Sequence, residues 1–219
     1  MLSRYVYVAI FSVLILTLLA CAISASRQYK GLGKAVLWLD IAFIPPILGN
    51  AIIVIANRKW LALVGCYIYY VGMDFVIYEL VQFTEVYCKS ARKPRKVPGW
   101  IKWVLLADAI QLLINPVTKH AFDVRWDVIN GEVFYLLEPF AGQYIHRLVD
   151  YGLFFAVILT FAITTFRNSR IYREKYFIMF VSILAVGVWE IYFNISKNPI
   201  DRSMMNRTGT EDKEDNTGN

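Results

Sequence analysis

Long apolar stretches separated by short polar loops make up most of this chain. A helix needs about 20 mostly apolar residues to cross the hydrocarbon core of a bilayer. In lipid the backbone must satisfy its own hydrogen bonds, so each such stretch is predicted to be an α-helix. We therefore expect an all-α fold, a polytopic transmembrane bundle with six visible spans. The spans are Tyr5–Ser24, Ala35–Ala56, Trp60–Val81, Ile101–Pro116, Tyr144–Phe166 and Tyr176–Asn194.

Composition supports this class. The chain is 58% hydrophobic and only 18% charged, which is too apolar for a soluble domain of 219 residues. The fourth span is the weakest prediction because it is short and carries Asp108. The first apolar run is longer than the roughly 7–15 residues of a signal-peptide core, so we expect it to stay as a span. The three cysteines have neither disulfide-framework nor metal-ligand spacing, and we expect no metal site and no cofactor.

Basic residues in short loops predict the orientation, because they favour the cytoplasmic side. Loops one, three and five carry more Lys and Arg than the loops on the other side. The N-terminus is therefore predicted to be extracytoplasmic, and six spans return the C-terminal tail to the same side. The net charge of +6 comes mostly from the cytoplasmic loops, so no nucleic-acid partner is needed. The expected partners are the lipid bilayer, a small ligand of unidentified chemistry and a second copy of the chain in a homodimer.

Polar residues inside the spans are costly and therefore point to function. Asp108, Gln111 and Asn115 share one helical face at i, i+3 and i+7. His146 and Asp150 share a face in the next span. We predict a pocket open to the outside and roofed by the loop from Val117 to Gln143. Its predicted ligand-binding residues are Gln111, Asn115, His146, Asp150, Glu190, Trp126 and Trp189.

The alternative is that these groups only satisfy each other between helices, for example Asp150 with His146 or Arg147. Polar contacts of this kind are common in membrane bundles. A second set, Asp40, Asp74, Glu79 and Glu85, lies in spans two and three, and we assign it to the inner half of the bundle. Asp74 and Glu79 are five residues apart and point to different faces, so no proton relay is evident.

The second span contains the segment DIAFIPPILGN, from Asp40 to Asn50. Pro45 and Pro46 remove two backbone donors from the middle of the helix, which predicts a kink there. Such a kink can act as a hinge or as the wall of a binding site, and many membrane helices carry proline for shape alone.

Several segments together resemble a known family. They are WLDIAFIPPILGNAIIV, YYVGMDFVIYELVQFT, LLADAIQLLINPVTKHAF and YIHRLVDYGLFF, within a match from about Lys34 to Met204. The chain resembles the N-terminal seven-transmembrane sensor region of bacterial histidine kinases, which is also found ahead of diguanylate cyclase domains. The resemblance implies a sensory input module that binds an external or membrane signal and relays it to a cytosolic output domain. It assigns no binding residues.

The resemblance stops after Met204, where a seventh span is expected and a polar segment, MNRTGTEDKEDNTGN, stands instead. We therefore divide the chain into a sensor domain, residues 1–204, and a disordered tail, residues 205–219, whose composition fits disorder. A truncated or frameshifted sensor explains this ending. It also explains why the chain shows six spans although a cytosolic output domain requires an odd number of crossings. A genuine six-span variant is the alternative.

Two other function classes are weighed against sensing. A small transporter or ion- or proton-coupled carrier usually shows repeat symmetry between its halves. The prolines of span two have no counterpart in spans five or six. An intramembrane enzyme needs a nucleophile with its base or a metal set, and no HExxH or GxSxG motif occurs. We therefore expect no enzymatic activity in this chain, a location in the cell membrane and a sensory role.

Overall fold

In the computed structural model, the residues described are 4–27, 31–88, 98–129 and 132–167, with 177–178, 181 and 184–185. The chain divides into two compact units, Met1–Thr160 and Phe161–Asn219. All the strands and the helices α1 to α6 belong to the first unit, and α7 runs from the first unit into the second.

Four helical segments are long and apolar enough to cross a membrane. They are α1 (Arg4–Ser26), α2 and α3 taken together (Gly31–Ala42 and Ile44–Ile55), α4 (Lys59–Cys88) and α7 (Ala141–Arg167). These segments correspond to the first, second, third and fifth predicted spans. The prediction of a helical chain that could reside in a membrane is therefore confirmed at this level.

The fourth and sixth predicted spans have different outcomes. Helix α5 (Gly99–Leu113) has 15 residues and is therefore only about 22 Å long. It is not among the helices that could cross a bilayer unaided. Most of the sixth predicted span, Tyr176–Asn194, lies outside the described residues, as do residues 205–219. Six spans are thus not shown in the described part of the chain.

A small β-hairpin follows α5 and the one-turn helix α6 (Asn115–Thr118). Strands β1 (Phe122–Ile129) and β2 (Glu132–Pro139) pair antiparallel, with Phe122 opposite Pro139. Lys119, with a left-handed φ of 50°, ends α6 and turns the chain toward β1. The expectation of an all-α chain is wrong at this point, because the segment predicted to be a roofing loop is a sheet.

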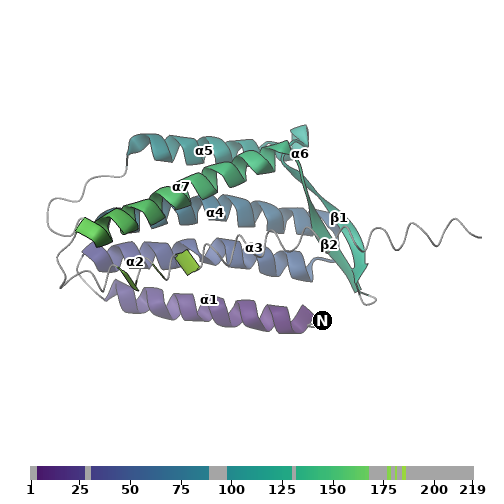
Figure 1. The fold of residues 1–219 in the computed structure, drawn as a ribbon. Helices are drawn as coiled ribbons and strands as arrows, with labels where there is room; N and C mark the ends of the chain where they lie inside the picture. Colours follow the sequence, from purple (N-terminus) through teal and green to yellow (C-terminus); the bar gives the residue numbers. More distant parts are fainter. Residues whose placement is uncertain are drawn as a thin grey trace, which may run out of the picture. The chain divides into compact units, whose positions relative to one another are not determined.

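Helix α4 is the centre of the first unit. It packs against α2, α3, α5 and β1, while α1 packs against α2 and α3 (Figure 1). The contact between α3 and α4 is close because small residues face each other. A Cβ on Gly49 would lie 2.6 Å from the backbone nitrogen of Tyr69 and 2.7 Å from the carbonyl oxygen of Gly65. Small residues at such crossings let membrane helices pack backbone to backbone.

The second predicted span is broken where the two prolines occur. Helix α2 ends at Ala42 and α3 begins at Ile44, so Pro45 and Pro46 lie in the first turn of α3. A missing N–H is tolerated in a first turn because it has no intrahelical partner there. Gly72 of α4 packs against this break, since a Cβ on Gly72 would lie 2.8 Å from Cδ of Pro46. Hinge motion at this break stays a prediction.

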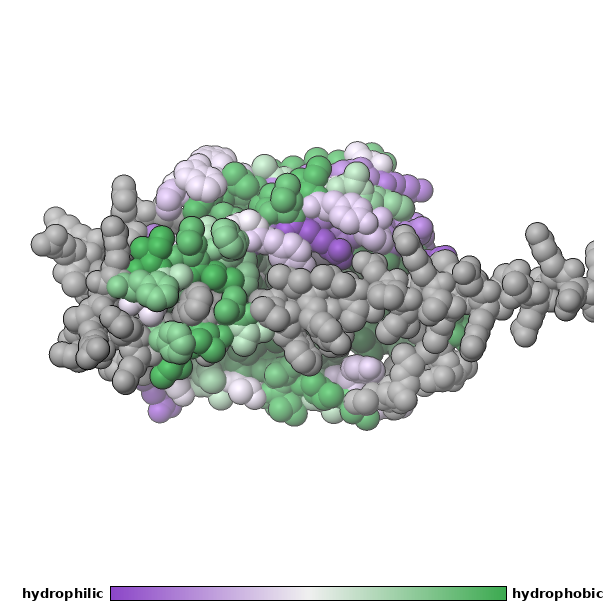
Figure 2. Space-filling view, in the orientation of Figure 1, coloured by the Kyte–Doolittle hydropathy of each residue, from purple (hydrophilic) through white to green (hydrophobic). Residues whose placement is uncertain are grey.

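Large apolar side chains are exposed along α1, α5 and α7, among them Leu16, Trp103 and Leu148. Figure 2 shows hydrophobic residues over much of the coloured surface. A hydrophilic group lies where Figure 1 draws the end of α5 and α6. Apolar surface of this kind suits contact with lipid chains. Trp60 at the start of α4 and Trp100 at the start of α5 are exposed, as is common for tryptophan at membrane interfaces.

Candidate functional site

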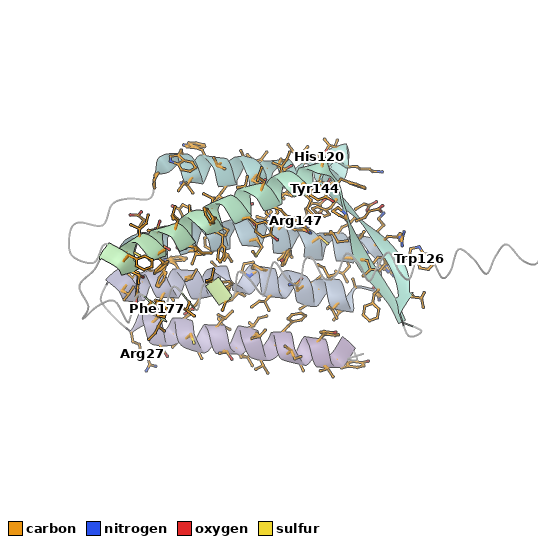
Figure 3. All side chains as sticks on the ribbon, in the orientation of Figure 1. Arg27, His120, Trp126, Tyr144, Arg147 and Phe177 are labelled. Atoms are coloured by element: carbon orange, nitrogen blue, oxygen red, sulfur yellow. The ribbon has the colours of Figure 1, made fainter. Side chains whose placement is uncertain are left out.

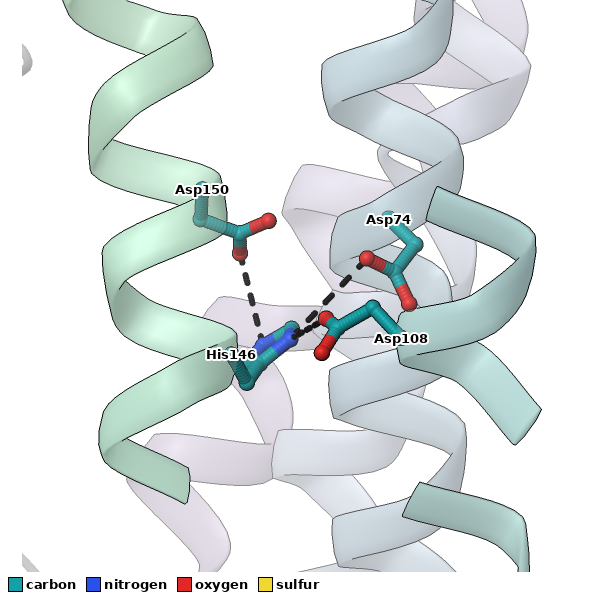
Figure 4. Close-up of side chains that lie close together, drawn as sticks. All are labelled: Asp74, Asp108, His146 and Asp150. Carbon is teal, nitrogen blue, oxygen red and sulfur yellow. Dashed lines mark hydrogen bonds and ion pairs between the residues drawn. The ribbon is translucent and has the colours of Figure 1, made fainter. Parts of the chain in front are cut away.

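Three helices of the first unit bring four ionisable side chains together in its interior. Asp74 comes from the middle of α4, Asp108 from α5, and His146 and Asp150 from α7. All are buried, and one ligand-type atom from each lies within 4.8 Å of the others (Figure 4). We call these residues the Asp–His cluster.

His146 is the centre of the cluster. Its Nδ1 atom lies 2.5 Å from Oδ2 of Asp108 and 3.9 Å from Oδ1 of Asp74. Its Nε2 atom, on the other side of the ring, lies 3.3 Å from Oδ2 of Asp150. The imidazole therefore has a carboxylate against each of its two nitrogens (Figure 4).

Local helix geometry explains this arrangement. His146 and Asp150 are four residues apart and so share one face of α7. Tyr70 precedes Asp74 by four residues on α4, and its ring meets the His146 ring edge to face, with centroids 5.2 Å apart. Gln143 holds the Tyr70 ring in this position, because its amide nitrogen donates to the Tyr70 hydroxyl. Together these contacts hold the imidazole in place.

The carboxylates of the cluster are incompletely paired. Neither oxygen of Asp74 has a hydrogen-bond partner, and Oδ1 of Asp150 also has none. Asp74 is only 5% exposed, so it has little contact with bulk solvent. In the described part of the chain no Lys or Arg pairs with these three carboxylates. Buried carboxylates that stay charged are normally paired or bound to a metal, so these groups need either protons or a cation.

A chain of hydrogen bonds connects the cluster to the surface. Gln111 donates from Nε2 to Oδ1 of Asp108 over 3.0 Å and to the carbonyl oxygen of Gly142 over 3.1 Å. Its Oε1 atom lies 2.9 Å from Nε2 of His120. Nδ1 of His120 in turn hydrogen-bonds the hydroxyl of Thr118, which is exposed. Polar side chains thus lead from buried Asp108 to solvent at the end of α6.

Asn115 has a different role, in what we call the hairpin clamp. Its Oδ1 atom accepts hydrogen bonds from the backbone N–H groups of Ala121 and Phe122, over 2.7 and 3.3 Å. Its Nδ2 atom donates to the Phe122 carbonyl over 2.7 Å and to the Tyr67 hydroxyl over 3.2 Å. The side chain is 2% exposed and fully used. It fastens the start of β1 to α4.

The hairpin has a second tie to α4, at the surface. Nζ of Lys59 donates to Oδ2 of Asp123 over 2.8 Å, and the Val124 N–H donates to Oδ1 of the same carboxylate. Partial burial alone would raise the pKa of Asp123. The hydrogen bonds from Lys59 and Val124 and the charges of Lys59 and Lys119 outweigh it and hold the pKa below its usual 3.8.

The predicted ligand-binding residues separate into groups. His146 and Asp150 belong to the cluster, and Gln111 adjoins it. Asn115 is engaged in the hairpin clamp. Trp126 lies on the hairpin with 65% of its surface exposed, and Figure 3 shows it on β1 rather than beside α7. Trp189 and Glu190 lie outside the described residues.

Sequence reasoning missed Asp74 and Gln143 as members of this neighbourhood. We placed Asp74 with the inner acidic set, but the structure brings it to Asp108 and His146. Intramembrane acidic residues were the available signal. The alternative in which Asp150 pairs with His146 is observed as a contact, yet it leaves the other oxygen of Asp150 without a partner.

The arrangement offers one imidazole and three carboxylates to a cation, or sites for shared protons. No protein-family model matches the chain, and no curated protein matches it significantly.

Proposed function

We propose that this chain is the membrane-embedded input module of a bacterial signalling receptor, with the Asp–His cluster as the site that receives the signal. The observation that carries the proposal is the convergence of three helices on buried carboxylate oxygens that have no hydrogen-bond partner. The motif resemblance to histidine-kinase and diguanylate-cyclase sensor regions supports the same role. In this proposal the chain has six spans, and a seventh span of the full-length receptor connects them to the cytosolic output domain that receives the signal.

The cluster suits a sensor because its parts belong to different helices. Asp74, Asp108 and His146 come from α4, α5 and α7, so any species that binds among them favours one packing of these helices. A ligand shifts such an equilibrium only by its difference in affinity for the two packings. The helix break at Pro45 and Pro46 contacts α4 at Gly72, two residues from Asp74, and can absorb the shift.

The proposed orientation puts the hairpin outside the cytoplasm. Within the first unit, the start of α4 and the hairpin lie at one end, joined by Lys59 and Asp123. The loop between α4 and α5, which contains Lys89 to Lys96, is then cytoplasmic. A periplasmic reporter should be active when fused after Glu132 and inactive when fused after Lys96. The reverse result contradicts the orientation.

The sensory role is tested in a chimera that joins the chain, through one added span, to a diguanylate cyclase domain. Replacing Asp150 with asparagine keeps the side-chain shape and removes the charge beside His146. We expect this change to alter cyclic dinucleotide output while insertion and accumulation stay normal. Asp123→Asn is the matched control, because Asp123 is a surface carboxylate on the hairpin, and it should leave the output unchanged. Equal output from all three chimeras contradicts the proposal.

Transport is the second candidate, and one observation favours it. Glu79 is a further buried carboxylate on α4, on a different helix face from Asp74, and a carrier would use both groups. Purified chain in liposomes separates the two functions. Sensing predicts no proton flux above that of empty liposomes, whereas flux that disappears in Glu79→Gln and Asp74→Asn favours a carrier.

A further inference from the structure

We propose that the cluster binds one divalent transition-metal ion through Asp74, Asp108 and Nδ1 of His146, with Asp150 positioning the imidazole. This inference rests on the site of the proposed function and names the chemical class of its ligand. No metal site was expected from the sequence, because the cysteines lack metal-ligand spacing and no HExxH motif occurs.

The two nitrogens of His146 define which side holds the ion. A neutral imidazole has one N–H donor and one lone pair. If Nε2 donates its proton to Asp150, 3.3 Å away, the lone pair of Nδ1 points at the carboxylates of Asp108 and Asp74. A lone pair against two carboxylates is repulsive unless a metal ion lies between them or a carboxyl group is protonated. Metal-bound histidines commonly donate their other N–H to a carboxylate, which is the position of Asp150.

Asp74 distinguishes a metal ion from a proton. A proton on Nδ1 satisfies Asp108, whose Oδ2 is 2.5 Å away, but Asp74 at 3.9 Å is beyond hydrogen-bond range. A second proton, shared between Asp74 and Asp108, would then be needed to give either oxygen of buried Asp74 a partner. An ion with several coordination positions takes both carboxylates and the imidazole at once. Figure 4 shows the Asp74 carboxylate directed at the same side of His146 as that of Asp108.

The distances fit such an ion after small side-chain movements. Zinc-type ions hold nitrogen and oxygen ligands at about 2.0–2.2 Å, so neighbouring ligand atoms lie roughly 3.0–3.5 Å apart. The contacts of Nδ1 with Asp108 and Asp74, at 2.5 and 3.9 Å, fall on either side of that range. Adjustments of about half an ångström at each carboxylate therefore complete the site.

The ligand set selects the class of metal. Imidazole suits zinc, iron, copper and nickel, while carboxylates suit manganese, magnesium and calcium. One imidazole with carboxylates therefore favours Mn²⁺, Fe²⁺ or Zn²⁺ over Ca²⁺ and Mg²⁺, which prefer oxygen ligands alone. The hydrogen-bonded chain through Gln111 and His120 connects Asp108 to Thr118 at the surface.

The test uses the full chain, purified into lipid nanodiscs and stripped with a chelator, and Co²⁺ as a probe with visible absorption. We expect saturable binding of one Co²⁺ per chain and an X-ray absorption spectrum with one imidazole ligand. Asp74→Asn and Asp108→Asn should each weaken binding at least 100-fold. Asp150→Asn should weaken it about 10–100-fold, as loss of a residue that orients a ligand does. Asp123→Asn is the matched carboxylate control and should bind as the wild type does.

Three results overturn the proposal: no saturable Co²⁺ binding by the wild type, a bound ion without an imidazole ligand, or wild-type affinity in folded Asp74→Asn. The first two use only the wild type, so they decide the matter even if a variant fails to accumulate. The cyclase chimera separates the two proposals. If Asp150→Asn alters the output but Co²⁺ does not bind, the sensor proposal stands and the metal proposal is wrong. If Co²⁺ binds but Asp150→Asn leaves the output unchanged, the metal proposal stands and the sensor proposal is wrong.

Discussion

The hairpin clamp around Asn115 and the Asp–His cluster around Asp74 are both buried polar sites, but their side chains are satisfied to very different degrees. Asn115 uses both ends of its amide in four hydrogen bonds, three of them to the backbone of Ala121 and Phe122. Asp74 has no hydrogen bond at either oxygen. The two residues are almost equally buried, at 2% and 5% exposure.

Under the proposed function, this difference separates structural from functional polarity in the bundle. A buried amide with all its partners stabilises one arrangement of the chain. A buried carboxylate without partners destabilises that arrangement until a cation binds, so its energy changes with ligand. Polarity inside a span therefore does not identify a site by itself, and the state of its hydrogen bonds does.

The largest expected effect is at the clamp. Asn115→Ala leaves two N–H groups, one carbonyl and the Tyr67 hydroxyl without their partner, and each unpaired buried group costs about 1–3 kcal/mol. We expect the chain to lose about 3 kcal/mol or more of unfolding free energy, measured by thermal unfolding in detergent. Thr118→Ala removes an exposed side chain from the same short helix and is the control. A loss no greater than that of the control contradicts the structural role.

A smaller effect is expected where α7 meets the polar chain from the cluster. A Cβ on Gly142 would lie 2.7 Å from Cδ2 of His120 and 3.0 Å from Oε1 of Gln111. Gly142→Ala should therefore cost about 1–2 kcal/mol, because one extra methyl group overpacks the site. Gly152 lies on the same helix with no atom near its Cβ position. Gly152→Ala should be neutral or stabilising by up to about 1 kcal/mol. Unfolding curves in which Gly152→Ala is less stable than Gly142→Ala would contradict the close packing at Gly142.

The smallest effect is expected at the surface tie between Lys59 and Asp123. The side chains are 54% and 34% exposed, so solvent screens the pair and we expect about 0.2–1 kcal/mol. The lowered pKa of Asp123 gives the sign of its pH dependence. The contribution is present above the unfolded-state pKa and is lost as pH falls through the lower folded-state pKa. Unfolding midpoints of wild type and Asp123→Asn should therefore converge in acid, and a gap that widens there contradicts the pairing.

Much of the fold follows from local sequence, because helix length and the effect of proline act within one segment. The long apolar runs predicted four of the helical segments, and Pro45 and Pro46 predicted the break in the second. The hairpin was missed although β1, FDVRWDVI, alternates apolar and polar residues as a strand does. Its aromatic residues were assigned to a loop over a pocket instead.

The cluster could be predicted only in part. The i, i+4 spacing placed His146 and Asp150 on one face, and the i, i+3 spacing placed Gln111 with Asp108. The spacing also grouped Asn115 with them, but the chain changes from α5 to α6 at Ile114, and Asn115 turns to the hairpin. The position of Asp74 depends on how α4 is rotated against α5 and α7, and no local pattern contains that information.

Unfolding of wild type and Asp74→Asn, each with chelator and with Zn²⁺, tests the central claim most directly. The account predicts a crossover. With chelator, Asp74→Asn should be as stable as the wild type or more stable, because it removes a buried carboxyl group that has no hydrogen-bond partner. With Zn²⁺ at about 100 times its dissociation constant, the wild type alone should gain about 2.7 kcal/mol. An Asp74→Asn chain that is less stable than the wild type with chelator, and gains as much from Zn²⁺, would contradict the account.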